Sequence, residues 1–155
     1  MNIVIKPIGE VRNSIQEPLK EGWEEVISEL SLDTSIESAT EGLEKFSHII
    51  VIFWMHKVPR GKGIPTKVHP QGRLELPLVG LFATRTPYRP NPVGVSIVRL
   101  LGCQGNILKV KGLDAIDGTP VIDIKPYLPR DSVPEAIFPQ WVAKLRQGYC
   151  ETKSI

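Results

Sequence analysis

Residues 48–56 read HIIVIFWMH, and the rest of the chain is best interpreted outward from this run. Its apolar part, Ile49–Met55, is far shorter than the roughly 18–20 residues that an apolar helix needs to cross a membrane. A short run rich in β-branched and aromatic residues is typical of a buried strand. We therefore predict a buried strand over His48–His56.

Other short strands are expected on both sides of this run. Frequent Gly and Pro between short apolar segments favours a closed barrel or a sandwich, and closure leaves no sheet edge exposed. We predict a mainly all-β fold, a single small β-barrel of about six to eight strands over residues 1–155. The further strands are expected at Asn2–Ile8, 26–32 (unless EEVISEL begins a helix), Leu78–Thr84, Val93–Leu101, Ile107–Leu113 and Val121–Lys125.

One or two short helices complete the predicted fold. Residues 35–45 are polar, with Ser38 and Glu41 at capping-box spacing. Residues 136–146 place Ile137, Trp141 and Leu145 on one helical stripe, which predicts a C-terminal helix over 136–148. A long loop is expected over 57–77, and loops of that length in small domains are usually functional or mobile.

A second stretch, GLFATRTPYRPNPVG at 80–94, predicts a stiff cationic loop. Each of its prolines fixes φ and disfavours helix in the preceding residue. Arg85 and Arg89 are thereby held at little entropic cost, and arginine suits carboxylates and phosphates. The loop indicates an anionic or nucleotide-like ligand, or else it is an ordinary proline-rich connection.

Charge is unevenly distributed although the net charge is only +2. Residues 1–47 carry four Lys/Arg against ten Asp/Glu, whereas residues 57–100 carry eight Lys/Arg against Glu75 alone. Clustered positive charge indicates a local anionic partner such as an RNA backbone, or a solvated basic loop.

Composition restricts the class of protein further. The 155 residues are enough for one buried core, and the two cysteines lack disulfide or metal-site spacing. The three histidines lack such spacing as well, so no metal is expected. There is no GxGxxG, P-loop or GxSxG motif, and neither a signal peptide nor a membrane span is apparent. We expect a cytoplasmic protein without membrane contact.

The segment GLDAIDGTPVIDIKPYLP at 112–129 places carboxylates where the strand pattern breaks. Asp117–Gly118 is a hairpin turn signal. Asp114 and Asp123 interrupt apolar strands, which makes them candidate ligand acceptors. The alternative for Asp123 is a surface ion pair with Lys125. An exposed ion pair of this kind contributes only about 0–1 kcal/mol to stability.

The runs FATRTPYRPNPVGVS and DGTPVIDIKPYLP, together with GLEKFSHIIVIFWMH at 42–56, resemble the TrmO/YaeB-like (TsaA-like) family. The resemblance implies a small β-barrel, binding of S-adenosylmethionine (SAM), a homodimer with the pocket near the subunit boundary, and N6-methylation of threonylcarbamoyladenosine at position 37 of tRNA. Two departures concern the substrate: the chain resembles the barrel alone, without the C-terminal domain of longer relatives, and residues 13–26 lack their PRQ-like stretch, for which Trp23 is a possible substitute.

The resemblance and the residue chemistry together give the candidate site. The SAM-binding candidates are His56, Lys57, Arg85, Asn91, Val95, Asp114, Asp117, Gly118 and Thr119. The RNA-binding candidates are Arg60, Lys62, Lys67, Arg73, Arg89, Lys125 and Tyr127. Lys125 is also a candidate for the methionine carboxylate, and Tyr127 for the adenosine.

Methyl transfer asks mainly for alignment of the nucleophile with the methyl group, so no catalytic base is assigned. Three function classes remain open: a SAM-dependent RNA methyltransferase, which we favour, a SAM-binding sensor without turnover, and a plain RNA-binding barrel. A methyltransferase acting on another RNA or on a small molecule is a variant of the first class.

Overall fold

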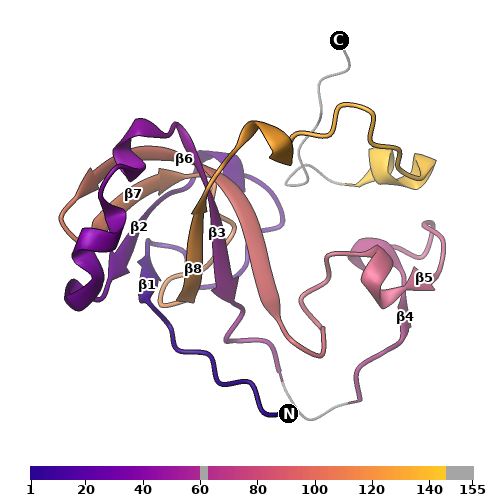
Figure 1. Cartoon of the computed structure of the whole chain (residues 1–155). Helices are drawn as coiled ribbons and strands as arrows, with labels where there is room; N and C mark the ends of the chain where they lie inside the picture. The colour runs from indigo at the N-terminus through magenta and orange to yellow at the C-terminus, as the bar shows by residue number, and fades with distance from the viewer. Residues whose placement is uncertain (60–62, 146–155) are drawn as a thin grey trace.

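Strand β3 (His48–Trp54) is the predicted buried strand, and it lies between two other strands of a closed barrel. The computed structural model describes residues 1–59 and 63–145. Every neighbouring pair in the barrel is antiparallel, in the order β1-β2-β7-β6-β3-β8 (Figure 1). The remaining barrel strands are β1 (Gly9–Arg12), β2 (Ile27–Leu32), β6 (Val93–Gln104), β7 (Ile107–Lys111) and β8 (Pro120–Pro126). The predicted mainly all-β barrel is confirmed.

Alternation along β3 separates the core from the outer surface. Ile49, Val51 and Phe53 point inward and are at most 3% exposed, whereas Ile50 and Ile52 are half-buried on the outer side. Inward residues of the other barrel strands complete one hydrophobic cluster. Successive strand residues point to opposite faces, so this single cluster fixes the register of every barrel strand.

The strand pairing brings three connections to one end of the barrel. Cα partners Ile27↔Lys111, Trp54↔Val93 and Glu10↔Pro120 show that β1, β3 and β7 end where β2, β6 and β8 begin. The segments 13–26, 55–92 and 112–119 therefore all leave the sheet at this end, which we call the site rim. The opposite end carries the segments 33–47, 105–106 and the chain after β8.

Residues 63–92 form a small lobe beside the barrel (Figure 1). In this lobe β4 (Lys67–Val68) pairs with β5 (Val79–Gly80), and Leu76 and Leu81 are buried. The Arg73 guanidinium donates a 2.5 Å hydrogen bond to the Lys144 carbonyl, which ties the lobe to the segment after β8.

Only 3-10 helices are present in the described ranges 1–59 and 63–145. Gly and Pro interrupt the connections too often for an α-helix to extend. The helices are η1 (Trp23–Glu25), η2 (Thr34–Thr40), η3 (Leu43–Lys45), η4 (Pro70–Gly72), η5 (Leu81–Ala83), η6 (Pro129–Asp131) and η7 (Gln140–Lys144).

Four sequence predictions of local structure are wrong. Residues 2–8 alternate but form no strand, because β1 begins only at Gly9, where neighbouring strands become available on both sides. Residues 78–84 hold only the two-residue β5 and then η5. The loop expected over 57–77 contains β4 and η4. The Asp117–Gly118 turn joins β7 to β8, which are not neighbours in the barrel, so it closes no hairpin.

The helical predictions also need correction. The predicted helix 136–148 is the short η7, because Pro139 precedes it with extended backbone; the part from residue 146 on lies outside the described residues. Residues 35–45 form η2 and η3, which Gly42 separates at φ 86°. The cap of η2 is Asp33, whose carboxylate accepts from the Ser35 N–H at 2.9 Å, rather than Ser38.

Candidate functional site

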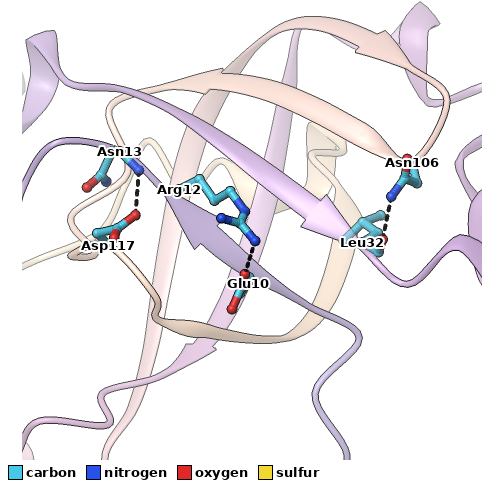
Figure 2. Close-up of polar contacts among 6 residues, drawn as sticks. All are labelled: Glu10, Arg12, Asn13, Leu32, Asn106 and Asp117. Atoms are coloured by element: carbon cyan, nitrogen blue, oxygen red, sulfur yellow. Dashed lines mark hydrogen bonds and ion pairs between the residues drawn. The ribbon is translucent and has the colours of Figure 1, made fainter.

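The Asp117 carboxylate joins two of the three rim connections. It accepts a hydrogen bond from the Asn13 backbone N–H at 3.0 Å (Figure 2). The Gln16 side-chain amide lies 3.4 Å from the other carboxylate oxygen. In return the Asp117 N–H donates to the Ile15 carbonyl at 2.7 Å. The hydrogen bond from Asn13, followed by that from Gln16, lowers the pKa of Asp117 below its ordinary value. Asp117 is thus the ionised anchor of the turn over residues 114–119.

Gly118 and Thr119 complete this turn. Gly118 adopts φ 74°, a left-handed conformation that favours glycine, and its N–H donates to the Val11 carbonyl at 2.7 Å. Thr119 is only 2% exposed. The structure therefore places both predicted site residues in the turn itself, with Gly118 at the surface and Thr119 buried immediately before β8.

Asp114 lies on the exposed side of the same turn, against β6. Its carboxylate accepts a short hydrogen bond from the Ser96 hydroxyl. Val95, the neighbour of Ser96 in β6, is 57% exposed. Because successive strand residues point to opposite faces, Val95 faces the outer side of β6 with Ile52, whereas Ser96, which holds Asp114, faces the other side with Val51. The structure therefore does not bring Asp114 and Val95 to one face of the rim.

Lys57 connects the third rim segment to the first. Its ammonium donates to the Gln16 carbonyl at 2.8 Å and lies 3.6 Å from the Glu17 carboxylate. The adjacent His56 is exposed just beyond the end of β3. His48 is at the opposite end of β3, where its ring makes an edge-to-face contact with Tyr127, with the ring centroids 6.5 Å apart.

The proline-rich loop before β6 presents its two arginines differently. Arg89 turns back on the loop: it donates to the Thr84 carbonyl at 2.8 Å, and its guanidinium carbon lies 5.6 Å from the Phe82 ring centroid. Arg85 is exposed, and no hydrogen bond or ion pair engages it within residues 1–59 and 63–145. Asn91 is also exposed, immediately before β6. Arg89 thus stabilises the loop conformation, whereas the exposed Arg85 and Asn91 are available to a ligand.

The RNA-binding candidates are dispersed. Arg60 and Lys62 lie outside the described residues. Arg73 contacts Glu75 at 2.6 Å besides the Lys144 carbonyl, and Lys67 is exposed on β4. Lys125 and Tyr127 lie at the end of β8 away from the site rim, and Lys125 forms the expected surface ion pair with Asp123 at 2.7 Å.

Sequence reasoning missed Asn13, Gln16 and Ser96, which form hydrogen bonds with the candidate residues at the site rim. The only local signal is the position of Asn13 at a strand end, where Asn commonly bonds nearby backbone. No helix in the described part of the chain is long and apolar enough to cross a membrane. Nor do three or more His, Cys, Asp or Glu residues among those described gather as metal ligands.

Comparisons with known proteins agree on one family. The family model described as tRNA-methyltransferase O N-terminal domain matches residues 12–132. A "Probable S-adenosyl-L-methionine-binding protein" of Methanothermobacter thermautotrophicus is 44% identical over 131 residues, covering 82% of this chain and 91% of the relative. The Escherichia coli tRNA (adenine(37)-N6)-methyltransferase is 47% identical over 103 residues, covering 63% of this chain and 43% of the enzyme.

Solved structures give the same result. A crystal structure of TrmO from Pseudomonas aeruginosa matches with a TM-score of 0.71 at 33% identity, over 88% of this chain and 62% of that chain. The present chain therefore spans less than two thirds of the solved TrmO chain.

The closed antiparallel barrel, with its polar constellation at the rim, defines an all-β domain class without a Rossmann-type sheet. Within that class, the match over residues 12–132 is decisive. The chain belongs to the tRNA-methyltransferase O N-terminal domain family.

Proposed function

We propose that this protein is a SAM-dependent methyltransferase that modifies N6 of an adenine in tRNA, with its cofactor site at the site rim. The observation that carries the proposal is that Lys57, Asp114 and Asp117, from two connections far apart in sequence, meet at one rim of a barrel of this family. Relatives named as SAM-binding proteins and as a tRNA (adenine(37)-N6)-methyltransferase support the same activity.

The exposed polar groups at the rim suit the chemistry of SAM. Its ribose hydroxyls need acceptors, and the exposed Asp114 carboxylate can accept from them. Its methionine carboxylate needs a cation, for which Arg85 is exposed and has no partner in the described residues. Lys57 and Asp117 are bound to the 13–17 segment, so we assign them to holding the site together.

SAM would supply the electrophilic methyl group: the adenine N6 lone pair forms the new N–C bond, the S–C bond breaks, and a proton leaves N6. The protein's part is to align N6 with the methyl group, which supplies most of the acceleration. Arg85 stays protonated and therefore positions ligands rather than accepting this proton. His56, exposed beside the rim, is a candidate proton acceptor.

For the substrate, we propose threonylcarbamoyladenosine at position 37 of tRNA. A base in a single-stranded loop can leave its stack at low cost, which suits a site on a barrel rim. Arg60, Lys62 and the exposed Lys67 would contact the phosphates.

The proposed location of the protein is the cytoplasm. The proposed partner of the outer face of β3 and β6 is a second copy of the chain. Val95 and Ile97 are 57% and 55% exposed, directly across from the half-buried Ile52 and Ile50. Leu101, which is 42% exposed, lies further along β6 beyond the exposed Arg99 and is not part of this apolar pair. Contiguous exposed apolar surface of this kind marks association sites, and here it adjoins the rim through Val95.

Two measurements test the proposed function in sequence. Isothermal titration calorimetry with SAM is expected to show binding, and its absence would remove the cofactor. Mass spectrometry of nucleosides from tRNA incubated with protein and SAM is expected to show the N6-methylated base. Binding without turnover on any tRNA would indicate instead the second candidate, a SAM-binding sensor.

A further inference from the structure

The side chain of Asn13 makes a hydrogen bond with every polar group it has. Its Nδ2 amide donates to the Ala115 carbonyl and to the Ser28 hydroxyl, both at 2.9 Å. Its Oδ1 accepts from the Ile15 N–H at 2.9 Å. Because both donors and the acceptor are used within the chain, Asn13 has little capacity left to contact a ligand.

These bonds fix two of the three segments that build the rim. The bond to the Ala115 carbonyl holds the residue directly after Asp114, and the Asn13 backbone N–H holds Asp117. Ser96 fixes Asp114 from the β6 side. Ser28, at 1% exposure, attaches the whole arrangement to the interior of β2. Asn13 thus connects the end of β1, the start of β2 and the turn over residues 114–119.

An amide is the group that this position requires. Ala115 offers a carbonyl oxygen, which accepts only, whereas Ile15 offers an N–H, which donates only. A carboxylate of the same shape would present oxygen to oxygen at Ala115, and a methyl group would leave the buried Ser28 hydroxyl and the Ala115 carbonyl without their partner. Both replacements cost more than one ordinary hydrogen bond.

We propose that Asn13 is a positioning residue for the SAM site: it holds the turn over residues 114–119 so that Asp114 faces the cofactor. This role rests on the proposed function, since it assigns Asn13 to the same site. Asn13 acts through Ala115 and Asp117 and does not itself contact SAM.

The chain offers a matched control at the opposite end of the barrel. The Asn106 amide donates to the Leu32 carbonyl at 2.6 Å, also between side chain and main chain (Figure 2). Asn106→Ala therefore removes a comparable bond without touching the site rim. Asn13→Asp keeps the shape of the side chain and serves where Asn13→Ala does not fold.

The experiment measures SAM affinity by calorimetry and amide hydrogen exchange by mass spectrometry on the full chain and these variants. Asn13→Ala and Asn13→Asp are expected to weaken SAM binding roughly tenfold or more, the effect of losing about one well-made hydrogen bond. Exchange at Asp117 and Gly118, whose N–H groups bond Ile15 and Val11 at 2.7 Å, is expected to accelerate. Asn106→Ala is expected to keep SAM affinity within about twofold of the original chain.

The two readouts separate the possible failures. SAM affinity unchanged in both Asn13 variants, or weakened equally by Asn106→Ala, would overturn the positioning role. If the original chain does not bind SAM, the proposed function fails. In that case, unchanged exchange at Asp117 and Gly118 in Asn13→Ala would also refute the claim that Asn13 holds the turn over residues 114–119. Accelerated exchange would show that Asn13 holds the turn but has a structural role only.

Discussion

The Phe53 ring lies against the main chain of Gly94, its Cα partner across β3 and β6. A Cβ at Gly94 would fall 2.3 Å from two carbon atoms of this ring. No side chain fits at that distance, so Phe53 and Gly94 specify each other inside the barrel.

Gly94→Ala is therefore expected to destabilise the protein by about 1–3 kcal/mol through overpacking. The measurement is the free energy of unfolding from chemical denaturation. Gly102→Ala in the same strand is the control, since its Cβ would meet nothing within 4 Å. That variant is expected to stay within about 1 kcal/mol of the original chain. Equal losses in the two variants would contradict the role of the Phe53 contact.

The lowered pKa of Asp117 predicts a pH dependence of stability. Its contribution is fully present above the unfolded-state pKa, about 3.9, and is lost as the pH falls through the lower folded-state pKa. Asp33, whose pKa is lowered by hydrogen bonds from Ser35, acts in the same direction. Unfolding free energies measured from about pH 6 downward should thus fall less steeply in Asp117→Asn than in the original chain. The same slope in both proteins would show that Asp117 contributes no such linkage.

Arg85→Ala is expected to weaken SAM binding by roughly 1–3 kcal/mol, because a charged hydrogen bond to the ligand is lost. Calorimetric titration measures the change. Arg130→Ala, an exposed arginine in η6 at the opposite end of the barrel, is the control and should bind SAM normally. Unchanged affinity in Arg85→Ala would remove Arg85 from the site.

Ile97→Asp is expected to convert the proposed dimer into monomers, because a carboxylate would have to be buried between the apolar faces. Light scattering after size-exclusion chromatography gives the molar mass. Ile27→Asp is the matched control: Ile27 is 49% exposed on β2, away from the β3–β6 face. A monomeric original chain would refute the proposed partner.

Replacing Lys62 and Lys67 with alanine is expected to weaken tRNA binding and leave SAM affinity unchanged. Each lost phosphate contact should reduce the slope of log affinity against log salt by roughly 0.7–0.9. Filter binding over a salt series measures this slope, and Lys109→Ala, on the outer side of β7, controls for the loss of a positive charge outside the basic segment. If the original chain binds no tRNA at low salt, the basic segment is a solvated loop.

Five of the six barrel strands could be predicted because their patterns are local. The apolar run of β3 and the alternation along β2, β6, β7 and β8 each identify a strand without knowledge of its neighbours. Residues 2–8 show the limit of this reasoning: they alternate equally well, yet pairing begins only at Gly9. At the C-terminal end, the apolar stripe of residues 136–146 predicts a helix, but Pro139 has extended backbone, so the helical part begins only at η7.

The site could be predicted in part for the same reason. Asp114, Asp117 and Gly118 interrupt strands or form a turn, which is visible locally. The role of Asn13 depends on Ser28, Ala115 and Asp117, partners that only the folded barrel brings close. The commitment of Arg89 to the Thr84 carbonyl likewise follows from loop conformation rather than residue type.

The segments 13–26, 55–92 and 112–119 all leave the barrel at one end. The domain therefore separates the barrel strands, whose register must be preserved, from the rim segments, whose length can change. An insertion within 55–92 lengthens the rim but shifts the register of no barrel strand, since Trp54 and Val93 remain paired. Relatives of this chain can therefore diverge in what they recognise by changing loop length, while the same sheet keeps folding underneath.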